Sequence, residues 1–132
     1  MPQQISDKDV INCPKCHVPM RPLRAGRFTV DRCEKCFGLW LDKGERLKIL
    51  KDKKLVDAID IGPEETGRQH DEIRQIDCPR CGVPMHHVTD RAQKHIGFEF
   101  CRECQGSFLD AGELRDLSEF TILERIRALF GH

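Results

Sequence analysis

The 132-residue chain contains no tyrosine and one tryptophan, and aromatic residues make up only 6% of it. It has no apolar run long enough to cross a membrane. Its first residues also lack the cationic start and the apolar core of a secretory signal. We therefore expect a protein without a membrane span that resides in the cytoplasm, where reducing conditions disfavour disulfides.

The sequence also lacks an excess of charge of either sign, because 22 basic residues balance 22 acidic ones. Bulk electrostatics therefore give no support to nucleic-acid binding. Basic residues nevertheless gather in the first half of the chain, where they are candidate phosphate contacts: Arg21, Arg24, Arg27, Arg32 and Lys35. A charge run of this kind is more often simply solvated.

Motifs of common catalytic sites are missing too. There is no glycine-rich phosphate loop, no serine nucleophile motif and no lone reactive cysteine, and the six histidines have no ligand spacing. Two carboxylate pairs, Asp42 with Glu45 and Asp110 with Glu113, could in principle flank a substrate. Aspartate followed three residues later by glutamate, just before helix-like sequence, is more typical of a capping box. We predict capping, no enzymatic activity and no small-molecule substrate.

What the chain does contain is eight cysteines, all in Cys-x-x-Cys pairs. They form two sets: Cys13, Cys16, Cys33 and Cys36, then Cys78, Cys81, Cys101 and Cys104. Each pair supplies two thiolates from one tight turn, and two pairs joined by a hairpin close a tetrahedron that suits zinc. We predict two structural zinc ions per chain, because four protein ligands leave no open coordination position. Iron in a rubredoxin-like site is the chemical alternative, since the same ligands serve it, but the aromatic residues are too few for a rubredoxin core.

The two cysteine sets lie in an internal duplication. Cys-Pro-x-Cys-x-Val-Pro-Met occurs twice, and so does Cys-x-x-Cys-x-Gly-x-aromatic-Leu-Asp-x-Gly-Glu. This pattern resembles the bacterial zinc-ribbon family named for the zinc finger of transcription factor IIB, here in two tandem copies. The chain departs from the family pattern at Arg46, where the family has leucine, and at Phe108, where it has tryptophan. The resemblance implies the fold and the metal strongly and the function weakly.

Each repeat is too short to be stabilised by a hydrophobic core alone, so a metal or a partner must contribute, and zinc meets that need. Apolar residues alternate at period two around Phe28 and Val30, and again around Ile96 and Phe98, which predicts a β-hairpin in each repeat. The fold class we predict is a small, metal-dominated α+β protein. It consists of two tandem zinc ribbons, each a hairpin with two zinc knuckles, and each is followed by an α-helix.

The predicted domain organisation has three parts. Module one spans residues 1–59, an acidic linker spans 60–77, and module two with its C-terminal helices spans 78–132. The linker is polar and rich in turn residues, so we expect the modules to move relative to each other.

The predicted helices carry the functional hypothesis. A helix from Lys43 onward would have two apolar faces, of which the face with Ile49 and Val56 is expected to pack on its own ribbon. The other face is left for module two, a second copy of the chain or another protein: Leu47, Leu50 and Leu55. A further amphipathic helix is predicted at the C-terminus, from Ile122 to Phe130.

We therefore predict a non-catalytic protein-interaction module that binds a protein partner or a second copy of itself through the face formed by Leu47, Leu50 and Leu55. The alternative is a nucleic-acid-binding or transcription-associated regulator that uses the basic hairpin of module one. A rubredoxin-like iron redox protein is the third hypothesis.

Overall fold

The computed structural model describes residues 10–73, 75–89 and 97–119. The named elements are β1 Arg21–Ala25, β2 Phe28–Arg32, β3 Leu39–Leu41, α1 Glu45–Ile49, α2 Lys53–Ile59, α3 Glu64–Asp71, β4 His86–Thr89, β5 Gly97–Phe100 and β6 Ser107–Leu109. Residues 113–119 are helical as well. The amphipathic helix predicted from Ile122 to Phe130 lies outside the described residues.

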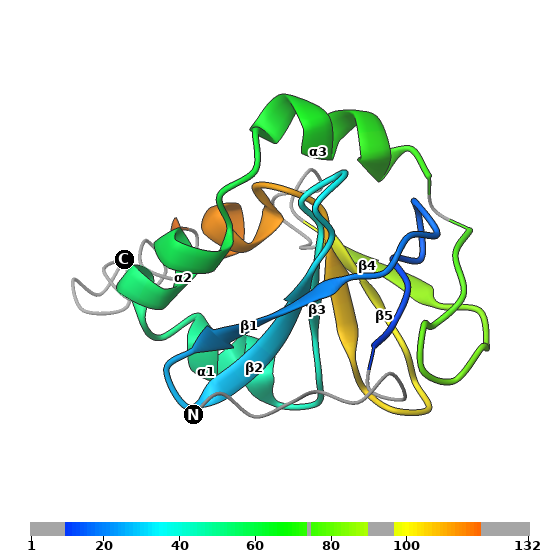
Figure 1. The fold of residues 1–132 in the computed structure, drawn as a ribbon, viewed down its shortest axis with the longest axis horizontal. Helices are drawn as coiled ribbons and strands as arrows, with labels where there is room; N and C mark the ends of the chain where they lie inside the picture. The colour runs from blue at the N-terminus through cyan, green and yellow to red at the C-terminus, as the bar shows by residue number, and fades with distance from the viewer. Residues whose placement is uncertain (1–9, 74, 90–96, 120–132) are drawn as a thin grey trace, which may run out of the picture.

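The strands form one antiparallel sheet in the order β1-β2-β3-β6-β5-β4 (Figure 1). Each module contributes three strands, and the order in module two mirrors that in module one. The two halves meet where β3 pairs with β6, with Trp40 opposite Phe108. The sheet runs across the module boundary, which contradicts the prediction that the two modules move as separate bodies.

The central strands bury side chains on both faces of this sheet. In β3, Trp40 packs in the cluster that holds the cysteines, while Leu39 and Leu41 pack in a second cluster with Ile49 and Val56. Alternate residues of a strand point to opposite faces, so the two clusters lie on opposite sides of the sheet. The zinc-binding side and the helical side of the molecule therefore share the same short strands.

The helix predicted from Lys43 is in fact two helices, α1 and α2, so the single-helix prediction is wrong. The helical path is interrupted at Asp52, whose backbone is extended. Its Oδ1 accepts hydrogen bonds from the N–H groups of Lys54 and Leu55 at 3.1 and 3.4 Å. This is an N-cap. The α2 helix lies beside β1 (Figure 1).

The break between α1 and α2 also divides the second apolar face that was predicted for a single helix. Leu50 and Leu55 are partly buried and pack against the cluster around Ile49 and Val56, which are fully buried as predicted. Only Leu47 stays open to solvent, with 60% of its surface exposed. Leu50 and Leu55 therefore pack within the chain and are not left for a partner.

The segment predicted as an exposed linker, residues 60–77, contains a helix and buried residues that pack on module two, although most of its described side chains are exposed. It includes α3 and Asp60, which is buried and accepts hydrogen bonds from the N–H groups of Gly112 and Arg115 at 2.9 Å. A Cβ on Gly67 in α3 would overlap the carbonyl of Ala111, so this helix touches the backbone of module two. The segment ties the modules together rather than separating them.

Candidate metal centres

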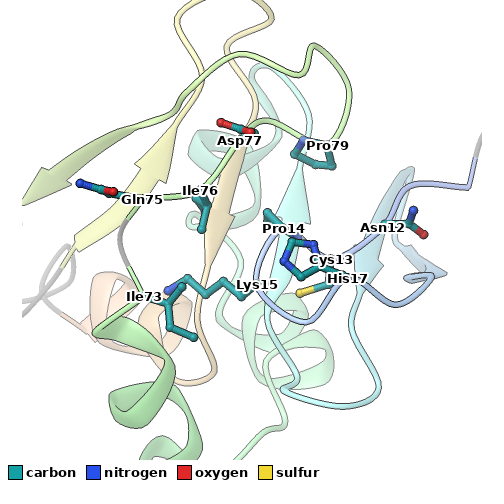
Figure 2. A pocket seen from close by; sticks show the side chains of 10 residues that line it. All are labelled: Asn12, Cys13, Pro14, Lys15, His17, Ile73, Gln75, Ile76, Asp77 and Pro79. Carbon is teal, nitrogen blue, oxygen red and sulfur yellow. The ribbon is translucent and has the colours of Figure 1, made fainter.

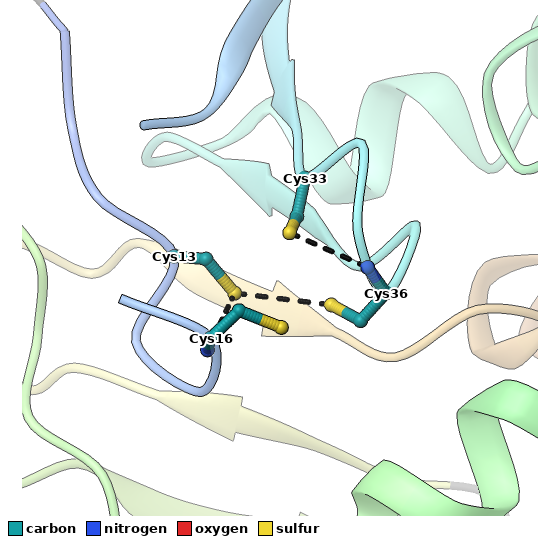
Figure 3. A group of neighbouring side chains, drawn as sticks. All are labelled: Cys13, Cys16, Cys33 and Cys36. Carbon is teal, nitrogen blue, oxygen red and sulfur yellow. Dashed lines mark hydrogen bonds between the residues drawn. The ribbon is translucent and has the colours of Figure 1, made fainter. Parts of the chain in front are cut away.

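The first centre is built from two turns that flank one hairpin. Cys13 and Cys16 come from the turn before β1, and Cys33 and Cys36 come from the turn after β2 (Figure 3). All four Sγ atoms lie within 4.8 Å of one another, and the Sγ atoms of Cys13 and Cys36 are 3.8 Å apart. The set was predicted from the spacing, and the fold assembles it.

The second centre repeats this arrangement in module two with Cys78, Cys81, Cys101 and Cys104. The Sγ atoms of Cys78 and Cys104 are 3.7 Å apart. Two sulfurs bound to one zinc ion in tetrahedral geometry lie about 3.8 Å apart. Both sets therefore fit a tetrahedral four-thiolate zinc site, which has no position left for water or substrate.

The backbone of each turn is shaped to present the thiolates. The N–H groups of Cys16 and Cys36 point at the Sγ atoms of Cys13 and Cys33, each at 3.4 Å (Figure 3). His17 has φ 61°, in the left-handed region that glycine prefers, and its counterpart Gly82 has φ 74°. Such N–H groups stabilise negative charge on sulfur.

The electrostatics of the first centre show why it needs a cation. Without metal, the Cys36 thiol donates to Cys13, which lowers the pKa of Cys13 to about 5, and the same contact raises the pKa of Cys36. Burial raises the pKa of Cys16 to about 11. One site thus holds thiols that cannot all ionise by themselves, and a zinc ion displaces their protons on binding.

The second of the two residues between the first cysteines of each module contacts the other module. The Nζ of Lys15 donates to the Oδ2 of Asp110 at 2.7 Å, and the Nε of Arg80 donates to the Oδ1 of Asp42 at 2.7 Å. Arg80 completes a fork with a second contact to Asp42, from Nη2 to Oδ2 at 3.1 Å. Each knuckle therefore holds the aspartate of the opposite repeat.

The capping box predicted for Asp42 and Glu45 is only half formed. The residue at the N-cap of α1 is Gly44, with φ 82° and no side-chain cap. The reverse half of the box is present, because the Oε1 of Glu45 accepts from the N–H of Asp42 at 2.8 Å. The Asp42 side chain accepts instead from Arg80 and from the indole Nε1 of Trp40, at 3.0 Å.

The repeated Gly-x-aromatic motif also makes contacts between the two modules. A Cβ on Gly38 would overlap the ring of Phe108, and a Cβ on Gly106 would overlap the ring of Trp40. Each module thus places its aromatic ring over the glycine of the other. Sequence reasoning missed this contact, although the signal was present, because glycine and an aromatic residue recur together in both copies.

Arg46, where the family pattern has leucine, also contacts module two. Its guanidinium lies 4.2 Å from the centroid of the Phe98 ring, and its Nε donates to the Oγ of Ser107 at 3.4 Å. Burial lowers its pKa. A cation over an aromatic face is favourable, so Arg46 forms a contact between the two modules.

The predicted basic residues differ in the partners that they contact. Arg21 lies 3.8 Å from Glu34, and Arg32 donates to the carbonyl of Ile59 at 3.4 Å. Arg24, Arg27 and Lys35 are exposed. Within the described residues, the last three make no ion pair.

Two hollows lie at the junction of the modules. One, of about 380 Å³, lies between the first knuckles of the two modules and the chain that follows α3 (Figure 2). The other, of about 220 Å³, is lined by the start of α1, including Leu47, and by Phe100, Gln105 and Ser107 of module two. Both exist only because the modules are joined.

Two closed four-thiolate centres, each held between the turns of a hairpin, define a tandem zinc-ribbon protein. The family described as "Transcription factor zinc-finger" matches residues 12–52 and 77–119, more than half of the chain and one cysteine set in each match, so the chain belongs to this family. The predicted family, its two tandem copies, the fold class and the two zinc ions are confirmed. No curated protein and no solved structure matches the chain. In the described part of the chain, no helix has the length and apolar character needed to span a membrane.

Proposed function

We propose that this protein is a non-catalytic protein-interaction module, in which two zinc ions hold two ribbons together as one binding surface. Closed coordination supports the absence of catalysis, because neither ion has a free position for a substrate. The zinc ions would then act by folding the chain, not by reacting.

The observation that carries the proposal is the exposure of Leu47 beside a hollow built by both modules. Leu47 is the most exposed large apolar side chain in the described residues, at 60%. The neighbouring depression of about 220 Å³ has Phe100 in its wall. An apolar side chain next to a partly apolar hollow suits a protein partner that inserts a side chain of its own.

A matched pair of variants tests this proposal. Leu47→Glu should abolish capture of the partner in a pulldown from the source organism, because the charge would be desolvated in the interface. Ile61→Glu, at another exposed apolar position with 51% exposure, should leave capture unchanged. Both should keep two zinc ions by elemental analysis. Sedimentation of the purified protein separates self-association from binding of a second protein. Unchanged capture and unchanged sedimentation with Leu47→Glu would refute the proposal.

Nucleic-acid binding is the second candidate, because Arg24, Arg27 and Lys35 are exposed and make no ion pair within the described residues. Replacing Arg24 and Arg27 by alanine should then weaken binding and flatten its dependence on salt. Nuclease treatment of the pulldown separates this candidate from the first. The iron alternative predicts a protein that absorbs visible light, whereas the zinc protein is colourless.

A further inference from the structure

One histidine lies against the first metal centre without belonging to its four ligands. His70, near the end of α3, has its Nε2 atom 3.9 Å from the Sγ of Cys16. The sulfur atoms of the four cysteines form the cluster by themselves. His70 is therefore a neighbour of the site and not one of its predicted ligands.

The ring is oriented as metal-binding histidines usually are. Its Nδ1 lies 2.9 Å from the carbonyl oxygen of Thr66, one turn earlier in α3. Since a carbonyl only accepts, Nδ1 carries the hydrogen, and the lone pair of the neutral ring is on Nε2, which faces Cys16. Metal-binding histidines commonly donate their other N–H to a backbone carbonyl in this way.

A second contact fixes this end of α3 to the site. The Nζ of Lys15, which lies between Cys13 and Cys16, donates to the carbonyl of His70 at 2.6 Å. The histidine and the knuckle that carries Cys16 are therefore held together.

Cys16 is also the ligand of this site that solvent reaches. It is half-buried, whereas Cys13, Cys33 and Cys36 are at most 1% exposed. Its counterpart Cys81 in module two is exposed, and no histidine nitrogen is within hydrogen-bonding reach of it among the described residues. Within the part of the chain that the structure describes, the two centres thus differ in whether their most accessible thiolate has a histidine neighbour able to bind zinc.

We propose that His70 is a reserve ligand of the first zinc centre. When Cys16 leaves the ion, the bond from zinc to Sγ breaks and a bond from zinc to Nε2 of His70 forms. The result is a three-cysteine, one-histidine site, which is an ordinary set for structural zinc. No electron is transferred, and the released sulfur takes a proton from water. Among the described residues, the second centre has no histidine in the equivalent place, so it loses its ion when Cys81 leaves.

Three variants test the exchange by competition with a zinc chelator. Cys16→Ala should keep two zinc ions, whereas Cys16→Ala combined with His70→Ala should bind the first ion more than about 100-fold more weakly, since a ligand is lost and not only an outer contact. Cys81→Ala, the matched control, should keep one ion under the same conditions. With cobalt as the probe, the ligand-field bands of Cys16→Ala should move to shorter wavelength, as imidazole replaces thiolate. Equal zinc affinities of the Cys16→Ala protein with and without His70 would overturn the proposal.

A second measurement avoids the loss of a ligand by mutation. Limited treatment of the zinc-loaded protein with iodoacetamide alkylates accessible thiolates, with loss of iodide and formation of a thioether. Native mass spectrometry of protein alkylated once at Cys16 should show two zinc ions in the original sequence and one in His70→Ala. The untreated His70→Ala protein should hold two ions, which shows that its fold is intact. Loss of one ion from both alkylated proteins would overturn the proposal.

Discussion

Lys15 and Arg80 hold equivalent positions in the two repeats but lie in different surroundings. The side chain of Lys15 is 0% exposed, and its partner Asp110 is buried as well. The side chain of Arg80 is 35% exposed and that of Asp42 is 43% exposed. A buried charge that loses its partner is costly, whereas an exposed pair contributes little. The two ion pairs should therefore differ in their effect on stability.

Asp110→Asn should lower the free energy of unfolding by about 3 kcal/mol, because it leaves the Lys15 ammonium buried against a neutral group. Asp42→Asn should cost about 1 kcal/mol or less, because water screens Arg80. Denaturant unfolding of the zinc-loaded proteins, at one fixed zinc concentration, measures both. Equal losses would show that the burial of Lys15 does not govern the pair. A silent Asp110→Asn would restore the simple capping interpretation, because asparagine caps about as well as aspartate.

The glycine that faces an aromatic ring in each module gives a second prediction at the residue scale. Gly38→Ala should destabilise the protein by about 1–3 kcal/mol through overpacking against Phe108. Combining it with Phe108→Leu should recover part of that loss, because the smaller side chain leaves room for the added methyl group. Thermal unfolding of the two single variants and the double variant forms a cycle that isolates the contact. Additive losses would mean that Gly38 and Phe108 do not touch.

The sequence predicted the metal ligands completely, because Cys-x-x-Cys spacing reflects a local turn. It did not predict the partners of Asp42 and Asp110. Aspartate three residues before glutamate fits a local cap, and Glu45 does make that bond. The contact with the other repeat depends on how the two modules are oriented, and no pattern within one repeat shows that. Arg80 and Lys15 could be recognised only by their matched places between cysteines.

At the scale of elements, apolar periodicity predicted the buried face of the helices and missed their break. Ile49 and Val56 fit one helix, and both are buried. Leu47, Leu50 and Leu55 also fit one helix, so the pattern gave no reason to divide it. The available signal was Asp52, since a short acceptor side chain favours the N-cap over the helix interior.

The role of Asp52 can be tested directly. Asp52→Ala should cost about 1 kcal/mol, because two N–H groups of α2 lose their acceptor. Asp52→Asn should be close to neutral, because its amide oxygen accepts the same bonds. Thermal unfolding at a fixed zinc concentration provides the comparison. If both variants behave like the original sequence, solvent satisfies the start of α2 and the cap is not what ends α1.

At the scale of the molecule, the duplication produces one folded unit with internal pseudo-symmetry. Corresponding strands meet at the centre, and β3 pairs with β6. Corresponding motifs contact the opposite repeat. The first knuckle of each repeat binds the aspartate of the other, and the glycine of each repeat faces the aromatic ring of the other. The repeat was visible in the sequence, but these contacts were not, and the acidic composition of residues 60–77 suggested a linker where α3 packs.

Loss of one zinc centre should therefore weaken the other. Cys33→Ser removes a fully buried ligand of the first centre, and the turns around β3 should lose their order with it. Phe108 would then lose its contact with Gly38, and Asp110 would lose the knuckle that presents Lys15. We expect zinc binding at the second centre to weaken by about tenfold or more, since tenfold corresponds to about 1.4 kcal/mol.

The matched variant Cys101→Ser makes the test quantitative, because coupling between two binding sites must be equal in both directions. Each single variant is titrated with a chelator, and the affinity of the surviving site is compared with that site in the original sequence. The factor lost by the second centre in Cys33→Ser should be close to the factor lost by the first centre in Cys101→Ser, because each variant removes one ion from the same coupled pair. Unchanged affinity in both variants would show that the shared sheet does not couple the zinc sites, and the modules would then be independent in solution.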